Sequence, residues 1–96
     1  MYKILFTKSF IKSSHQLERS GKFKKKELDD VLALLLSGKL LPASLHDHAL
    51  RGEYVGSREC HIRGDVLLVY QRHDDVLVLI MIDIGTHHKL FGSWVK

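Results

Sequence analysis

The sequence predicts an α+β fold in a single domain, residues 1–96, with two helices packed on one face of a mainly antiparallel sheet. Three observations predict it. The chain has 96 residues, of which 45% are hydrophobic, and this suits one modest core. Apolar residues recur at helical spacing in the first half, whereas alternating or continuous apolar stretches fill the second half. The predicted order is a strand, two helices, four strands and a short terminal helix.

The chain is predicted to begin with a short strand and a helix. The strand covers residues 3–6, and the helix covers residues 8–20 with Thr7 or Ser9 as its N-cap. Gly21 is expected to end this helix. Its inward stripe is predicted to be Phe10, Ile11, Ser14 and Leu17.

A second helix is predicted over residues 24–37 because apolar side chains recur at positions i, i+3, i+4 and i+7. The stripe consists of Leu28, Val31, Leu32, Leu35 and Leu36. Gly38 is expected to end the helix. Residues 40–49, which include the only proline, Pro42, are predicted to form a loop.

Four strands are predicted in the second half of the chain. They lie in residues 53–55, in residues 58–70, which hold two strands joined by a turn at Gly64 and Asp65, and in residues 76–82. Because the connections are short, these strands should form an antiparallel meander. Gly85 is expected to break the last strand, and Thr86 to cap a helix of residues 87–92.

One predicted strand carries an unusual set of polar side chains. Alternation sends Cys60 and Ile62 to a buried face, and it sends Glu59, His61 and Arg63 to the other, open face. Asp65 follows at the turn. An imidazole, a carboxylate and a guanidinium on one open face favour a site that handles a phosphate diester.

Basic residues are concentrated at the start of the chain. Residues 1–26 contain eight Lys or Arg and one acidic residue, in a chain of net charge +4 and pI near 9.3. Lys24, Lys25 and Lys26 crowd the first turn of the second helix, where the helix dipole disfavours cations, and Lys22 lies just before it. They are predicted to contact a polyanion such as RNA, although a solvated lysine-rich surface explains the same composition.

Nothing in the sequence predicts export or membrane insertion. Cys60 is the only cysteine, so no internal disulfide forms. The longest apolar run, residues 76–82, is far below the roughly 18 residues that span a bilayer. A cytoplasmic protein is expected.

Seven histidines allow three interpretations. His46 and His48, with His61 or the pair His87–His88, are candidate zinc ligands, but the chain has no HExxH motif and no cysteine pair, so we expect no metal and no other cofactor. Structural roles are expected for His15 and His73, while His46 and His88 stay undecided. Asp47 is interpreted as a loop residue or as a group that orients an imidazole, and Tyr70 as a packing residue.

The third interpretation is acid–base cleavage of RNA. This reaction needs a base for the 2′-hydroxyl proton, an acid for the leaving 5′-oxygen and cations near the phosphate. Histidine suits either proton transfer because its pKa lies near neutrality. The candidates are His48, Glu59, His61, Asp65 and His87, with Arg51, Arg58 or Arg63.

Four blocks of residues resemble the YafQ branch of the RelE/ParE toxin superfamily. They are residues 47–52 (DHALRG), 58–62 (RECHI), 65–70 (DVLLVY) and 85–91 (GTHHKLF). The resemblance implies a RelE-like fold and a bacterial cytoplasmic toxin of a type II toxin–antitoxin system. Such a toxin enters the ribosomal A site and cuts mRNA without a metal, leaving a 2′,3′-cyclic phosphate. A cognate antitoxin neutralises it, and promoter DNA is bound only through that antitoxin.

The resemblance also implies roles for individual residues. The catalytic set is His48, His61, Asp65 and His87. Asp65 would be the general base and His87 the general acid, and His48 and His61 would orient the phosphate, although these roles are exchangeable. Glu59 and Phe91 are supporting positions, and the N-terminal lysines are expected to contact ribosomal RNA, with a salt-sensitive attraction.

The sequence departs from the family pattern at three places. Asp83 and Ile84 stand where an arginine is common, so phosphate stabilisation passes to Arg51, Arg58, Arg63 or a histidine. Val66 replaces an aromatic residue, and Gly64 replaces a proline at the turn. Asp83 favours a competing hypothesis, a non-enzymatic binder on the same scaffold, such as a gyrase-inhibiting relative or an inactive co-repressor; the retained histidines argue against it.

Overall fold

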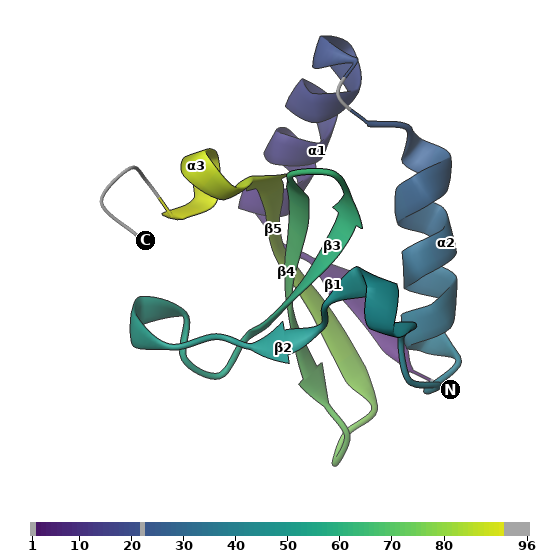
Figure 1. Ribbon diagram of the computed structural model, residues 1–96. Coiled ribbons are helices and arrows are strands. Elements are labelled where there is room, and N and C mark those ends of the chain that lie inside the picture. Colours follow the sequence, from purple (N-terminus) through teal and green to yellow (C-terminus); the bar gives the residue numbers. More distant parts are fainter. Residues whose placement is uncertain (1, 22, 92–96) are drawn as a thin grey trace.

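The structure is a computed structural model, and it describes residues 2–21 and 23–91. In chain order its elements are β1 (Lys3–Phe6), α1 (Lys8–Ser20), α2 (Lys25–Leu36), η1 (Ala43–Leu45), β2 (His48–Ala49), η2 (Gly52–Tyr54), β3 (Arg58–Arg63), β4 (Val66–His73), β5 (Val78–Thr86) and α3 (His87–Phe91). Figure 1 shows α2 and α3 on opposite sides of the sheet. The predicted α+β class and the order of helices and strands are confirmed.

The described residues form a five-stranded sheet in the order β1–β5–β4–β3–β2. Strands β2 to β5 pair antiparallel with their neighbours in sequence, so the predicted meander is confirmed. Strand β1 pairs parallel with β5, because α1 and α2 lie between β1 and the meander. The sheet is therefore mainly antiparallel, and β2 and β1 are its two edges.

Helix α1 has the predicted caps but a different buried stripe. The Thr7 hydroxyl accepts a hydrogen bond from the Phe10 N–H at 3.0 Å, and Gly21 ends the helix with φ 75°. The buried residues are Phe10, Ser13, Ser14 and Leu17. The prediction for Ile11 was wrong, since its side chain is 46% exposed. Successive helical residues diverge by about 100°, which turns Ile11 out of the stripe centred on Phe10 and Leu17.

Helix α2 begins on lysines that one acid helps to accommodate. The Lys24 backbone N–H donates to Glu27 Oε1 at 3.1 Å, and a carboxylate in the first turn also offsets the cations there. Leu28, Val31 and Leu35 are buried, while Leu32 and Leu36 pack at the edge of the core. The predicted stripe is confirmed.

The segment between α2 and β3 differs from its prediction. The second strand is β2, within the predicted loop, whereas the strand expected at residues 53–55 is absent and η2 occupies this segment. Gly52 has φ 70°, which turns the chain and prevents an extended segment there. The Leu50 N–H donates to the Ser57 carbonyl at 2.9 Å and closes the loop.

Strand β5 starts and ends later than predicted. Val76 and Leu77 are exposed in the β4–β5 turn, where Leu77 has φ 54°. Gly85 does not break the strand, because it pairs with Leu67 of β4. The apolar run therefore overestimates the strand at one end and misses polar residues that pair at the other.

Helix α3 lies directly on β5. The Thr86 hydroxyl accepts a hydrogen bond from the Lys89 N–H at 3.2 Å, which confirms the predicted cap. A Cβ atom at Gly85 would stand 3.6 Å from the Leu90 side chain. This is an ordinary van der Waals distance, so Leu90 packs over Gly85 without requiring a glycine there. Gly92, the expected last residue of this helix, lies outside the described residues.

The two faces of the sheet have unequal cores. The face under α1 and α2 has a large apolar cluster that includes Leu68, Tyr70, Leu79, Met81 and Ile84. The opposite face has a small cluster of Leu67, Val69 and Leu90, with Leu50, Tyr54, Ile82 and Phe91 packed against it. In the described part of the chain, no helix has the length and apolar character that crossing a membrane requires.

Candidate active site

A buried carboxylate lies between two imidazoles on the face opposite α1 and α2. Glu59 is only 4% exposed, and its Oε1 atom lies 3.7 Å from His48 Nε2 and 3.6 Å from His61 Nε2. His48 is directly opposite Glu59 across the β2–β3 pair, and His61 is two residues further along β3. Alternation therefore places all three side chains on one face. The prediction that Glu59 lies on an open face was wrong, because its carboxylate is buried beside the two histidines.

A bulge removes Arg63 from this face. The β3–β4 register shifts between His61 and Arg63, so simple alternation no longer applies at Arg63. Its guanidinium lies 3.6 Å from Glu27 of α2, on the helix-covered side. The prediction that Arg63 shares a face with Glu59 and His61 was wrong.

Arg58 also points to the helix-covered side. It pairs with Tyr70 across β3–β4, and its guanidinium donates to both carboxylate oxygens of Asp47 at 3.2 and 3.0 Å. The hydrogen bond with Asp47 raises the pKa of Arg58, against the opposing effect of burial. Arg58 is therefore engaged away from the imidazoles.

A hollow of about 230 Å³ joins residues from β2, β3, α3 and the adjacent loop. Its lining consists of His48, Leu50, Arg51, Glu59, His87 and Phe91. The hollow brings two predicted catalytic histidines together with Arg51. Of the three candidate arginines, Arg51 is the one that lines this space.

Asp65 and His87 lie at the same end of the sheet. Val66, at the start of β4, pairs with Thr86, at the end of β5. Asp65 directly precedes Val66, and His87 directly follows Thr86. Asp65 and His87 are both exposed. The His87 ring packs against Phe91, with 5.0 Å between the ring centroids. Asp65 and His61 are not part of the lining of the hollow, so the predicted set forms a row rather than one closed cluster.

The described hydrogen bonds of the Asp47 carboxylate go to Arg58 and Tyr70 and not directly to an imidazole. Besides Arg58, its carboxylate accepts a hydrogen bond from the Tyr70 hydroxyl at 2.6 Å. Tyr70 is 1% exposed, which confirms its packing role. Burial and the hydrogen bond to Asp47 raise the pKa of the Tyr70 phenol. Nearby, burial raises the pKa of the Cys60 thiol to about 12.

The remaining histidines lie apart from the hollow. His46 stacks at an angle near His61, with 5.1 Å between ring centroids, and His73 contacts the Gln71 side chain at 3.0 Å. His15 and His88 are exposed on α1 and α3. Across residues 2–21 and 23–91, no three His, Cys, Asp or Glu side chains are grouped so as to hold a metal ion.

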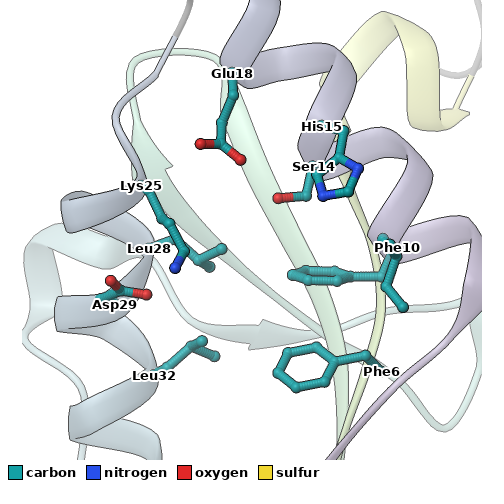
Figure 2. Close-up of a pocket in the computed structure, with 10 residues that line it drawn as sticks. Phe6, Phe10, Ser14, His15, Glu18, Lys25, Leu28, Asp29 and Leu32 are labelled. Atoms are coloured by element: carbon teal, nitrogen blue, oxygen red, sulfur yellow. The ribbon is translucent and has the colours of Figure 1, made fainter.

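A second hollow, of about 290 Å³, separates α1 from α2 (Figure 2). Apolar side chains such as Phe6, Phe10, Leu28 and Leu32 line it, together with the charged Glu18, Lys25 and Asp29. It contains His15 but none of the predicted catalytic residues.

Among the predicted RNA-binding lysines that the structure describes, Lys25 borders the second hollow. The Lys26 ammonium pairs with Asp30 at 3.1 Å. Lys24 is exposed at the start of α2. Lys22 lies outside the described residues.

Sequence reasoning missed two residues that shape the first hollow. Leu50 lines it directly. The Tyr54 ring meets Phe91 edge-on at 5.3 Å, and the Tyr54 hydroxyl donates to the Leu90 carbonyl at 3.3 Å, which ties η2 to α3. An aromatic residue just after Gly52 was the available signal, but it suggested a strand.

Comparisons with known sequences identify the relatives of this chain. A family model described as YafQ, a bacterial toxin of a type II toxin–antitoxin system, matches residues 2–92. The mRNA interferase toxin YafQ of Escherichia coli K12 is 37% identical over 67 residues, which cover 69% of this chain and 71% of that protein. A putative toxin YafQ of Haemophilus influenzae is 54% identical over 37 residues, which cover 38% of this chain and 36% of that protein.

Solved structures agree with these sequence matches. A copper-bound mutant toxin from Helicobacter pylori superposes with a TM-score of 0.86 and 38% identity, covering 95% of this chain and 100% of that one. The toxin-antitoxin pair DinJ–YafQ of Escherichia coli gives a TM-score of 0.85 and 28% identity, covering 96% of this chain and 100% of that one. The RelE-like arrangement predicted from the sequence is confirmed.

Proposed function

The chain belongs to the YafQ family of bacterial type II toxins, and from this premise we propose that it is a ribosome-dependent mRNA endoribonuclease. The relative from Escherichia coli K12 is named an mRNA interferase. The observation that carries the proposal is the hollow on the face opposite α1 and α2, which joins His48, Arg51 and His87 beside the buried Glu59.

The reaction fits the groups in this row. The 2′-oxygen attacks the phosphorus as a base removes its proton, and the bond from phosphorus to the 5′-oxygen breaks as an acid protonates that oxygen. The products are a 2′,3′-cyclic phosphate and a 5′-hydroxyl. Asp65 or His48 serves as the base, and His87, exposed at the start of α3 and packed on Phe91, serves as the acid.

Arg51 is the cation that the site offers to the phosphate. Arg58 and Arg63 are paired with Asp47 and Glu27, so they are not available to it. His61 lies next to the hollow, because its Nε2 atom is 3.6 Å from Glu59, which lines the hollow. Arg51 therefore takes over the charge stabilisation that Asp83, in place of an arginine, cannot supply.

The partners follow from the family and from the charge distribution. We propose that a cognate antitoxin neutralises the toxin in the bacterial cytoplasm, as the DinJ–YafQ pair suggests, and that promoter DNA is bound only through it. The ribosomal A site and its mRNA are the proposed target. Lys24, Lys25 and Lys26, exposed at the start of α2, are the proposed contacts to ribosomal RNA, and Lys22 is proposed with them from the sequence alone.

The test is to map mRNA ends in cells that express the chain. Primer extension should find cuts in phase with codons, and His87→Ala should abolish both the cuts and the growth arrest. DNA breaks without phased mRNA ends would instead favour a gyrase-inhibiting binder. Asp83, on the same face as the site because it pairs with Val69, is the observation that favours such a binder.

A further inference from the structure

A carboxylate network lies directly behind His48. Asp47, the residue before His48, accepts hydrogen bonds from Arg58 Nε at 3.2 Å, Arg58 Nη2 at 3.0 Å and the Tyr70 hydroxyl at 2.6 Å. A bidentate guanidinium fixes a carboxylate in direction as well as distance. Tyr70 is 1% exposed, and its strand β4 is the central strand of the sheet, so the network attaches a short edge segment to the centre of the sheet.

The network and the imidazole occupy opposite faces of the same strand. Strand β2 contains only His48 and Ala49, which pair with Glu59 and Arg58. His48 shares the site face with Glu59, whereas Asp47 reaches Arg58 and Tyr70 on the other face. Two paired residues cannot hold an edge strand by themselves. The side-chain bonds of Asp47 therefore add a fixed point on the N-terminal side of His48, where the Leu50–Ser57 backbone bond does not reach.

The His48 ring is held in one orientation. Its Nδ1 atom lies 2.7 Å from the His46 carbonyl oxygen, and a carbonyl can only accept, so Nδ1 carries a hydrogen. His46 itself has φ 50°, a left-handed conformation that few non-glycine residues adopt. Nε2, 3.7 Å from Glu59, is then the nitrogen that exchanges a proton over the hollow.

We propose that Asp47, through Arg58 and Tyr70, is the positioning residue that holds residues 46–48 so that Nε2 of His48 faces the reacting phosphate. The inference rests on the proposed function only in that His48 acts on RNA. Asp47 itself stays on the far face and touches no substrate. Arg58 thereby has a role that its position in the RECHI block did not reveal.

The chain contains a matched control for this network. Asp74, at the β4–β5 turn, also accepts hydrogen bonds from an arginine, Arg72 at 2.7 Å, and from a tyrosine, Tyr2. None of these three residues lines the hollow that contains His48. Arg72 and Asp74 instead border a hollow with Asp47, Arg58 and Tyr70. Asp74→Asn therefore removes the same kind of interaction on the same side of the sheet while leaving the Asp47 bonds in place.

The experiment compares Asp47→Asn with Asp74→Asn in the full chain. Steady-state cleavage on programmed ribosomes gives kcat and KM, and NMR of the histidine ring nitrogens reports the Nδ1–H of His48. We expect Asp47→Asn to lower kcat by about 10- to 100-fold with KM nearly unchanged, and to shift the His48 ring signals. Asp74→Asn should leave kcat, KM and those signals as in the wild type.

Two further variants keep the test decisive if Asp47→Asn folds poorly. Tyr70→Phe preserves the Arg58–Asp47 pair and should give a smaller loss of kcat with the same sign. Arg58→Lys keeps the charge but not the bidentate geometry, so it should lower kcat in the same way as Asp47→Asn. Unchanged His48 ring signals in folded Asp47→Asn or Tyr70→Phe would overturn the positioning role.

The ring signals do not depend on cleavage, so the two hypotheses fail separately. If the wild type cuts no mRNA but Asp47→Asn still shifts the His48 signals, the proposed function fails and the positioning role stands. If His87→Ala abolishes cleavage but Asp47→Asn changes neither kcat nor the ring signals, the proposed function stands and the positioning role fails.

Discussion

The two faces of the sheet differ in what they bury. Beneath α1 and α2, the sheet contributes fully buried apolar side chains such as Leu68, Leu79 and Met81. The opposite face buries a carboxylate, Glu59, under two imidazoles and has only a small apolar cluster around Leu67 and Val69. The helix-covered face is built mostly from apolar groups, whose transfer out of water is favourable. The opposite face also buries polar and charged groups, whose transfer out of water is unfavourable.

This difference shows how a chain of 96 residues combines stability with a reactive surface. The helix-covered face supplies most of the hydrophobic burial. The other face can then contain charged and titratable groups whose burial is unfavourable. Strand β3 contributes to both, because Cys60 lies in the core while Glu59 and His61 lie in the site. Substitutions on the two faces should therefore have separable effects.

The largest expected effect is on catalysis. His87→Ala should lower the cleavage rate by about 10²- to 10⁴-fold, because it removes the proposed general acid. The free energy of unfolding should change by less than about 0.5 kcal/mol, since His87 is exposed. Rapid-quench cleavage on ribosomes and urea denaturation measure the two quantities. A large loss of stability in this variant would contradict the proposal that the site face affects catalysis and not stability.

The converse substitution is Leu35→Ala on the helix-covered side. Leu35 is 1% exposed, so the free energy of unfolding should fall by about 2–5 kcal/mol. The cleavage rate per folded molecule should stay within about two-fold, because the site lies on the other face. Denaturation curves and active-fraction titration test this. A stability loss below 1 kcal/mol would contradict the assignment of the main core.

An alkaline titration tests the raised pKa of the buried Tyr70 phenol. The fold raises the pKa of Tyr70 through burial and its hydrogen bond to Asp47, so the folded state holds the proton more tightly than the unfolded state. Its contribution is fully present below pH about 10 and is lost above it, by at most about 1.4 kcal/mol per pH unit. Urea unfolding from pH 8 to 11 should show this slope in the wild type and a reduced slope in Tyr70→Phe. Identical slopes would show that Tyr70 ionises freely.

The smallest expected effect concerns a charge on the site face. Asp83 pairs with Val69, and its carboxylate accepts the Ile84 N–H at 2.8 Å. Asp83→Asn keeps that shape and removes a charge that repels the phosphate, so cleavage should rise by about three-fold, mostly at low salt. A fall in rate would mean that Asp83 serves the reaction instead of opposing it.

Local patterns predicted much of the fold. Thr7, Gly21 and the leucines of α2 act within one turn of a helix, so capping and periodicity identify them. The errors arose where tertiary contacts decide the structure. Strand β2 forms only because β3 lies beside it, and Gly85 stays in β5 because it pairs with Leu67.

The sequence predicted which residues belong to the candidate site more reliably than on which face of the sheet each one lies. His48, Glu59 and His87 line one hollow, although they come from three separate elements. Arg58 and Arg63 were expected beside them, but strand alternation and a bulge take both to the other face. A bulge has no simple signature in residue type, so Arg63 could not be placed from the sequence.

The most direct test of the central claim is the chemistry of the cut ends. Purified chain should be mixed with ribosomes that present an mRNA codon in the A site, with and without a zinc-selective chelator that spares the Mg²⁺ that ribosomes need, and the fragments analysed by mass spectrometry. Acid–base cleavage by the row of residues on the site face predicts a 2′,3′-cyclic phosphate and a 5′-hydroxyl, at the same rate in chelator. Fragments with a 3′-hydroxyl and a 5′-phosphate, or a cleavage that chelator abolishes, would contradict it.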